Sequence, residues 1–297
     1  RVLSIPAGVP FLPTLASALI DGTLVDGFAH DGDPLHLAAA TIYVPTRRAA
    51  RALRSAFVER LGATSAILPV IRPLGEFDDD TALFEPGPAD DLALAQPIEA
   101  LDRVLLLAPL VQAWKKRLPA HVAALFGEDI VAPASLADAV WLARDLAGLM
   151  DEIETAGSDW AGLGGLAPDD LAHWWQVTLE FLDIVTRAWP QVLAERDRSN
   201  PAAHRNAGIL AEAARLERRP PDGPVIAAGS TGSIPATADL LATIARLPMG
   251  AVVLPGLDTT IDERCWAEIG DARHPASFGH PQAGLKRLIG EIGVMRG

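Results

Sequence analysis

The residues best suited to chemistry in this sequence are arginines that follow directly on an apolar run. In VPTRRAARALR the run ends at Val44, and Thr46 offers a hydroxyl that can cap a helix. Arginines occupy the first two turns of that helix, at Arg47, Arg48 and Arg51. The amino end of a helix and guanidinium groups both favour phosphate oxygens. The pattern predicts a face that binds phosphate, and a solvated basic face paired with nearby acids is the alternative.

A second candidate is the loop in SIPAGVPF, made by Pro6, Ala7, Gly8 and Val9. It lies between an apolar run and a helical pattern, where nucleotide-binding proteins place a phosphate loop. Such a loop needs successive backbone N–H groups, a lysine and a hydroxyl for Mg²⁺. Prolines remove N–H groups here, and the first lysine of the chain is Lys115. We therefore expect no ATP hydrolysis at this loop, and an ordinary strand-to-helix turn is the plainer interpretation.

A third loop, GSTGSIP, joins an apolar run to the start of another helical pattern. Polar loops at the amino end of a helix suit an anion or a DNA backbone, although many such loops bind nothing. The residues concerned are Gly229, Ser230, Thr231, Gly232 and Ser233. A Mg²⁺-dependent hydrolase would also need an acid directly at a strand end, and none follows this apolar run.

The other titratable residues show no catalytic or metal-binding pattern. The 7 histidines form no HxH or HxxxH pair, so we expect no metal site. Cys265 is the only cysteine, which excludes a disulfide or a cysteine-held metal cluster within this chain. The sequence contains no GxSxG motif, so no nucleophilic serine of that kind is indicated.

Composition indicates a folded protein with uneven charge. Of 297 residues 49% are hydrophobic, which predicts a sizeable core. The net charge of −13 argues against a protein that coats nucleic acid over its whole surface. Charge is local, however, because Thr46–Arg60 is basic whereas Glu76–Asp91 is strongly acidic. We see no membrane span and no signal peptide, so we expect no membrane contact and a cytoplasmic location.

Apolar patterns predict strands that alternate with helices at both ends of the chain. The predicted strands are Val2–Ile5, Thr41–Val44, Ala66–Ile71, Pro224–Ala228 and Ala251–Leu254. The predicted helices are Phe11–Ile20, Thr46 to about Leu61, Pro235 to about Leu247, and one from Pro281. Short strands joined by helices that cross back imply a parallel sheet with helices on both faces.

The middle of the chain has no strand pattern and predicts an all-helical insertion. A Ser135–Asp138 capping box starts one helix, Pro168 another, and Asn200-Pro201 a third that runs to about Arg218. A further helix is predicted over 97–118. We therefore expect a discontinuous α/β domain, 1–92 with 200–297, interrupted by a helical subdomain at 93–199.

Five segments in a fixed order carry a resemblance to a known family. They are SIPAGVPFLPTLASAL, TIYVPTRRAARALRSAF, ILPVIRPLGEFDDD, VIAAGSTGSIPATADLLATIARLPMGAVVLPGLD and HPQAGLKRLIGEIG. The chain resembles the N-terminal part of AddB, the second subunit of the bacterial AddAB helicase–nuclease for double-strand break repair, in its alphaproteobacterial form. VPTRRAARALR and GSTGSIPATADLL are the most specific of these segments.

The resemblance implies a helicase-like region with a RecA-like, P-loop-type fold that has lost ATPase function, so this segment is not expected to be an enzyme. Pro6–Val9 stand at the phosphate-loop position, Thr46–Arg48 where a superfamily 1 helicase contacts single-stranded DNA, and Gly229–Ser233 where Mg²⁺-binding acids would be. A nuclease domain with an iron–sulfur cluster and Mg²⁺ follows in the family, so no cofactor is expected in this segment.

The implied partners are single-stranded or double-stranded DNA ends and an AddA-type helicase–nuclease subunit. Two other functions stay open. One is an α/β enzyme or small-molecule binder that uses loops 4–11 and 229–235 as an anion cradle. The other is a structural module whose apolar and tryptophan surface contacts a partner subunit.

Overall fold

The computed structural model describes residues 1–74, 95–117, 135–158, 160, 172–271 and 273–296. The chain divides into two compact units. The sheet unit comprises Arg1–Leu92 and Ala207–Gly297, and the helical unit comprises Ala93–Asn206. The acidic stretch Glu76–Asp91 and the helix start predicted at Pro168 lie outside the described residues.

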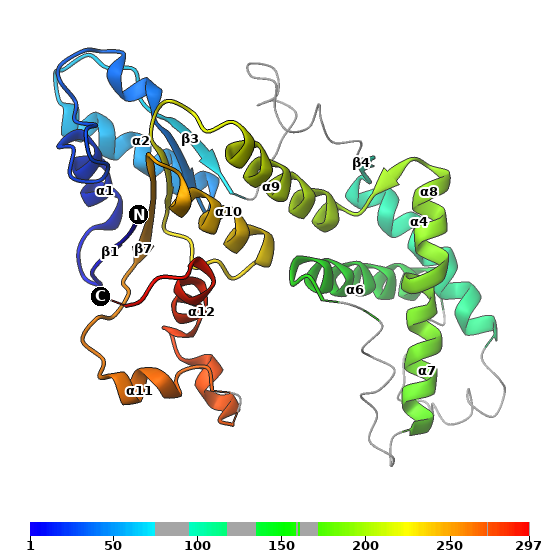
Figure 1. Ribbon diagram of the computed structural model, residues 1–297. Coiled ribbons are helices and arrows are strands. Elements are labelled where there is room, and N and C mark those ends of the chain that lie inside the picture. The colour runs from blue at the N-terminus through cyan, green and yellow to red at the C-terminus, as the bar shows by residue number, and fades with distance from the viewer. Residues whose placement is uncertain (75–94, 118–134, 159, 161–171, 272, 297) are drawn as a thin grey trace. The chain divides into compact units, whose positions relative to one another are not determined.

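The sheet unit contains a parallel five-stranded sheet in the order β1-β7-β6-β2-β3 (Figure 1). Its strands are β1 (Val2–Ile5), β2 (Thr41–Val44), β3 (Val70–Pro73), β6 (Val225–Ala228) and β7 (Gly250–Pro255). The parallel sheet that the sequence predicts is thereby confirmed.

Strand β3 begins later than the predicted strand Ala66–Ile71. The N–H of Val70 donates to the carbonyl of Ala40, directly before β2, at 3.0 Å. The N–H of Ile67 instead donates to the carbonyl of Pro34 at 2.7 Å, outside the sheet. Pairing with β2 therefore decides where this strand starts, and the apolar run alone does not.

Helices lie on both faces of the sheet. They are α1 (Phe11–Ile20), α2 (Arg47–Leu61), α9 (Pro201–Arg218), α10 (Pro235–Arg246) and α12 (Ala283–Ile292). The short helix α11 (Glu263–Glu268) lies beyond the ends of the strands (Figure 1). From β1 the chain moves across the sheet to β2 and β3, whereas from β6 it moves the opposite way to β7. Because such crossovers are right-handed, α1 and α2 pack on one face and α10 on the other (Figure 1).

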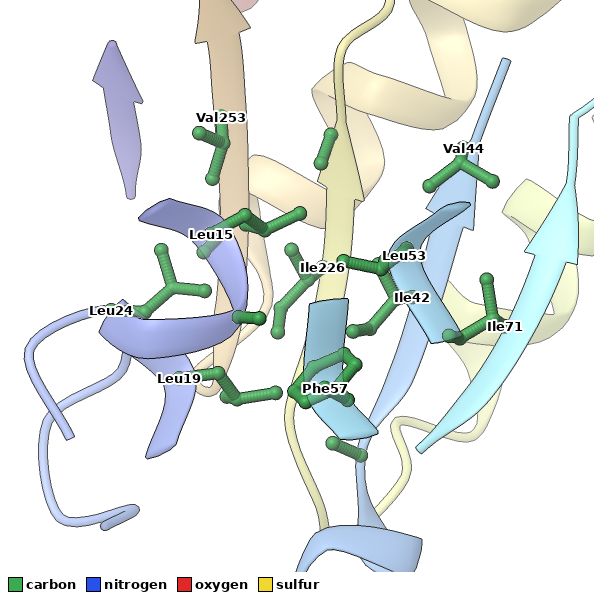
Figure 2. Packing of buried hydrophobic residues seen from close by; sticks show 14 of the residues in the cluster. Leu15, Leu19, Leu24, Ile42, Val44, Leu53, Phe57, Ile71, Ile226 and Val253 are labelled. Atoms are coloured by element: carbon green, nitrogen blue, oxygen red, sulfur yellow. The ribbon is translucent and has the colours of Figure 1, made fainter. Parts of the chain in front are cut away.

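Apolar side chains form the core between the sheet and helices α1 and α2 (Figure 2). Ile42 and Ile226 lie on this face, where they meet Leu15 of α1 and Leu53 and Phe57 of α2, all fully buried. Successive residues of a strand point to opposite faces, so Tyr43, which follows Ile42 in β2, packs on the other side of the sheet. Full burial of each large side chain contributes about 1.5–3 kcal/mol.

A buried ion pair holds helix α9 against the opposite face of the sheet. The carboxylate of Glu212 is fully buried and accepts hydrogen bonds from the Tyr43 hydroxyl and, at 2.8 Å, from Arg215 Nε and Nη2. Arg72 of β3 places Nη1 3.6 Å from Glu212 Oε1. Burial opposes ionisation, but these donors hold the pKa of Glu212 below its usual range. The carboxylate thus joins α9 to β2 and β3.

The helical unit contains α4 (Ala100–Arg117), α6 (Leu136–Thr155), α7 (Ala172–Asp183), the π-helical η5 (Ile184–Ala188) and α8 (Trp189–Glu195). The predicted capping box is confirmed, since Ser135 Oγ accepts from the N–H of Asp138 at 3.2 Å. In this unit Trp189 is buried and donates from Nε1 to Asn200 Oδ1 at 2.8 Å.

The prediction that this insertion is all-helical is wrong at its two ends. Two-residue strands β4 (Gln96–Pro97) and β5 (Arg198–Ser199) pair in parallel. Beside them, the N–H of Ile98 donates to the Ser199 carbonyl at 3.0 Å, and Ser199 Oγ donates to the Ala95 carbonyl at 2.7 Å. Strands this short leave no periodic pattern in a sequence.

Among the described residues, no helix is long and apolar enough to cross a membrane.

The substitution Glu212→Gln tests the buried ion pair. We expect the free energy of unfolding at neutral pH to fall by about 3 kcal/mol, because Arg215 and Arg72 lose the charge that compensates them. Urea denaturation monitored by circular dichroism measures the loss. The control is Glu217→Gln, an exposed position on the same helix, which should stay within about 0.5 kcal/mol of wild type. Equal effects at both positions would contradict the role of the carboxylate.

The same carboxylate predicts a pH dependence. Its pKa is lowered in the folded state, so its stabilisation is present above the ordinary glutamate pKa of about 4.3 and is lost as pH falls through the lowered value. The stability difference between wild type and Glu212→Gln should therefore shrink on acidification. A difference that grows in acid would show that Glu212 is not ionised in the folded protein.

Candidate functional site

The three loops that the sequence analysis singles out all lie at one edge of the sheet. Because the strands are parallel, the segments after β1, β7, β6 and β2 emerge side by side at what we call the carboxyl edge. The neighbours β6 and β2 lead in opposite directions, to β7 and to β3. In open α/β sheets such a switch point is where ligands bind. Here GSTGSIP follows β6, and Thr46 with its arginines follows β2.

The loop after β1 is an exposed turn with apolar side chains. The N–H of Val9 donates to the carbonyl of Pro6 at 3.3 Å, and Gly8 has a φ of 88°. Pro6, Ala7, Gly8 and Val9 are all exposed. A Cβ at Gly8 would meet nothing within 4 Å, so the turn is open on its outer side. The four residues carry no cationic side chain that could hold a phosphate.

The loop after β6 lies against the start of α1 and the segment after β2. A Cβ built on Gly229 would lie 3.3 Å from the ring of Phe11, at the start of α1, and 3.7 Å from Pro45, after β2. Within the loop, Ser230 Oγ accepts from the N–H of Gly232 at 3.3 Å. The structure thus brings GSTGSIP close to segments that lie far before it in the sequence, at Phe11 and Pro45.

Helix α12 supports the loop after β6 from behind. Gly232 has a φ of 60°, and a Cβ there would come within 2.6 Å of Leu288 Cδ1. Arg287 Nη2 donates to the carbonyls of Gly232 and Ser233 at 3.5 and 3.3 Å. The glycine is therefore required both by its backbone conformation and by the close approach of α12. Two loop carbonyls therefore accept from this arginine, which ties the loop to α12.

Helix α2 presents its arginines at the switch point. The cap predicted at Thr46 is confirmed, because Thr46 Oγ1 accepts from the N–H of Ala49 at 3.1 Å. Arg47, Arg48 and Arg51 are exposed on the first two turns. The positive end of the helix dipole and the guanidinium charges add at this place, which favours anions.

The arginines of α2 differ in what they contact. Arg54 Nη2 donates to the carbonyl of Ile71 at 3.2 Å, and Arg60 pairs with Asp21 at 2.8 Å. Within the described part of the chain, the guanidinium groups of Arg48 and Arg51 form no hydrogen bond or ion pair. The second half of the helix therefore uses its arginines for internal contacts, whereas Arg48 and Arg51 remain free for an external anion.

Among the described residues after β1, β7, β6 and β2, no carboxylate is presented to a metal ion. The first acid after β7 is Asp258, whose Oδ1 accepts from the N–H and the hydroxyl of Thr260 at 2.7 Å. These bonds and the N–H of Ile261 hold the pKa of Asp258 below its usual range. The carboxylate closes a turn. Across the described residues, no group of three or more His, Cys, Asp or Glu side chains could hold a metal ion.

Gln282, directly before α12, is a positioning residue that the sequence analysis missed. Its Oε1 accepts from the N–H of Asp258 at 3.0 Å, and its Nε2 donates to the carbonyl of Gly256 at 2.9 Å. From the other side, Ser4 Oγ of β1 accepts from the N–H of Leu257 at 3.0 Å. The loop after β7 is thus held between β1 and the segment that begins α12. In the sequence Gln282 is part of the segment HPQAGLKRLIGEIG, and no local pattern indicates its role.

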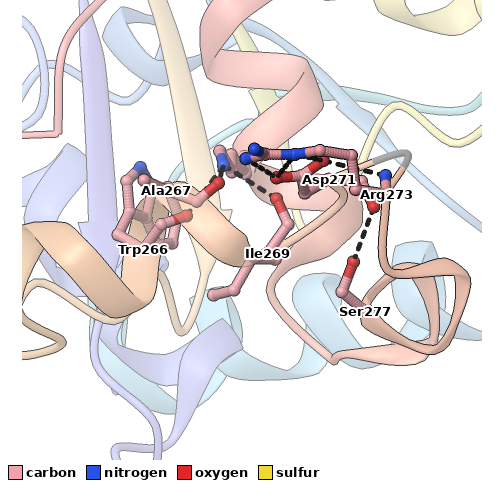
Figure 3. Close-up of polar contacts among 7 residues, drawn as sticks. Trp266, Ala267, Ile269, Asp271, Arg273 and Ser277 are labelled. Carbon is pink, nitrogen blue, oxygen red and sulfur yellow. Dashed lines mark hydrogen bonds and ion pairs between the residues drawn. The ribbon is translucent and has the colours of Figure 1, made fainter.

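The segment between β7 and α12 is fixed by a second polar cluster (Figure 3). Lys286 Nζ donates to three carbonyls at the end of α11, those of Trp266, Ala267 and Ile269, at 2.7, 2.9 and 2.7 Å. The C-terminal carbonyls of a helix have no partners within it, so the ammonium group satisfies them. Lys286 is therefore a structural cation and not a substitute for the missing phosphate-loop lysine.

No protein-family model matches this chain, and the curated proteins compared with it give no match.

The substitution Gln282→Ala tests whether this side chain positions the loop after β7. It removes two hydrogen bonds to backbone groups, so we expect stability to fall by about 1–2 kcal/mol. Hydrogen exchange at the Asp258 amide should become faster, because that N–H loses its acceptor. Gln191→Ala on α8 is the control, since Gln191 is exposed and has no hydrogen bond within the described residues. Unchanged exchange at Asp258 would disprove the positioning role.

Proposed function

We propose that this chain is a non-catalytic, helicase-like segment that contacts single-stranded DNA and acts as a scaffold beside an active partner helicase. The proposal extends the resemblance to the N-terminal region of AddB, and it assigns a RecA-like fold to the sheet unit. The observation that carries it is the position of Arg48 and Arg51 at the switch point, without partners within the described residues.

The chemistry of α2 supports a DNA backbone as the ligand. Guanidinium groups bind phosphate oxygens through paired N–H donors, and the amino end of α2 adds a favourable dipole. Arg48 and Arg51 are one helical turn apart, so they can contact neighbouring phosphates of one strand. Since the protein as a whole is acidic, with a net charge of −13, binding is expected to be local, weak in isolation and salt-dependent.

The absence of a motor function is supported by both loops that would form an ATPase site. Pro6–Val9 supply no lysine, and the residues directly after β6 are Gly229 and Ser230, neither of which is acidic. Asp258 is engaged in its own turn. ATP hydrolysis would then be the task of the partner, an AddA-type helicase–nuclease subunit acting on the same DNA end. Iron–sulfur and Mg²⁺ chemistry would belong to a downstream nuclease region of the family.

The double substitution Arg48→Gln/Arg51→Gln tests the DNA contact. We expect weaker binding of a fluorescent oligothymidine, measured by anisotropy at several salt concentrations. The slope of log affinity against log salt should become shallower by about 1.4, since each phosphate contact on single-stranded DNA contributes about 0.7.

The matched control is Arg54→Gln/Arg60→Gln, which removes the same charge from the same helix. Those arginines already contact Ile71 and Asp21, so the salt slope should change little. Circular dichroism confirms that both variants fold. Equal losses in the two variants would show that only the overall charge of α2 matters, and an unchanged slope in Arg48→Gln/Arg51→Gln would remove the proposed contact.

A phosphate-binding α/β protein is the second candidate, and one observation favours it. The open turn at Gly8 and the loop after β6 emerge at the same edge of the sheet, where backbone N–H groups can bind an anion. Millimolar ADP or inorganic phosphate should then raise the melting temperature by several degrees, because a ligand of the folded state stabilises it. The DNA proposal expects a shift below about 1 °C.

A further inference from the structure

The helical unit contains a hollow that none of the proposed functions uses. It has a volume of about 460 Å³ and lies between the start of α4 and the turn that joins α8 to β5. Ile98, Leu105 and Leu106 form its apolar lining. A hollow of this size accommodates one or two side chains of a binding partner.

The backbone holds the walls of this hollow in place. Strands β4 and β5 pair beside it, with Gln96 opposite Arg198. At the end of α8, Asp197 adopts a left-handed conformation with a φ of 51°, and its N–H donates to the carbonyl of Ala194 at 3.2 Å. This turn places Arg196 and Arg198 in the lining on either side of Asp197. The hollow is therefore already formed without a ligand.

Opposite charges line the hollow without pairing. Arg196 and Arg198 come from the α8–β5 turn, while Glu99 and Asp102 come from the start of α4. Within the described residues, none of the four forms an ion pair. Of these four side chains only that of Arg196 forms a hydrogen bond within the described residues, from Nη1 to the Val192 carbonyl at 3.5 Å. Two cationic and two anionic groups therefore remain available around one apolar floor.

The apolar floor continues outside the hollow along α4. Leu105 is 53% exposed, and Leu101, one turn earlier on the same helix, is 70% exposed. Residues four apart share one side of a helix, so these leucines form an exposed apolar stripe that leads into the hollow. Exposed apolar surface with a charged rim is typical of a protein interaction site.

The charges decide which ligand fits. A nucleic acid would meet repulsion from Glu99 and Asp102, and a purely apolar ligand would leave four charges to be desolvated. We infer that the hollow docks a short segment of another protein in which an acidic and a basic side chain flank apolar ones. Its carboxylate binds Arg196 and Arg198, its cation binds Glu99 and Asp102, and its apolar side chains cover Leu105 and Leu106.

The experiment uses the ¹⁵N-labelled chain and a blocked peptide, acetyl-Glu-Leu-Leu-Lys-amide, titrated by nuclear magnetic resonance. We expect saturable shifts of the amides in β4, in the first turns of α4 and at 196–199. The uncharged peptide acetyl-Gln-Leu-Leu-Gln-amide should bind about tenfold more weakly, because it loses both sets of charge contacts.

Variants separate charge recognition from folding. Arg196→Glu/Arg198→Glu should weaken binding of the charged peptide by about tenfold. Arg218→Glu/Arg219→Glu, which makes the same charge change at exposed positions outside the hollow, should bind as wild type does. Both spectra must retain the wild-type dispersion, which shows that the variants fold.

Three outcomes would overturn the inference. The first is no saturable binding of the charged peptide, and the second is equal affinity for wild type and Arg196→Glu/Arg198→Glu. The third is binding of oligothymidine at the same amides in preference to the peptide, which would make the hollow a nucleic-acid site. None of them bears on the contact at α2, which the salt-dependence experiment tests separately.

Discussion

The common direction of the five strands determines where every candidate functional group of the sheet unit lies. In a parallel sheet all strands end at the same edge, so four loops from distant parts of the sequence meet there. The strand order then decides which loops are neighbours. The pairing of β2 with β6 brings the arginines of α2 beside GSTGSIP, and the pairing of β1 with β7 brings Ser4 to Leu257. The chemistry available at this edge is a consequence of the topology.

Local signals in the sequence were sufficient for the elements with clear patterns. The run TIYV before a proline and a threonine predicts both the strand β2 and the cap of α2, because each depends only on neighbouring residues. The capping box at Ser135 is local in the same sense. The missing lysine near Gly8 is also visible without a structure. These features cover the strand-to-helix transitions that position the candidate site.

Contacts between distant residues could not be predicted in this way. Gln282 reaches back to Gly256 and Asp258, and Glu212 meets Tyr43 across 169 positions of the chain. Glutamine and glutamate are ordinary surface residues by pattern, and only the folded backbone shows which of them contact distant segments. The start of β3 and the two-residue strands β4 and β5 were missed because partner strands, not their own residues, define them.

The pairing of β4 with β5 holds the two ends of the helical unit together, so the length of the chain between them can vary. Residues near 95 and 199 lie next to each other, so the segment of about a hundred residues between them begins and ends at the β4–β5 pair. The entropic cost of bringing the two ends of a flexible segment together rises by only about 0.6 kcal/mol for each doubling of its length. Insertions and deletions within this segment can therefore accumulate during evolution while the β4–β5 pair is kept. The helical unit can then change in length without a change in the sheet.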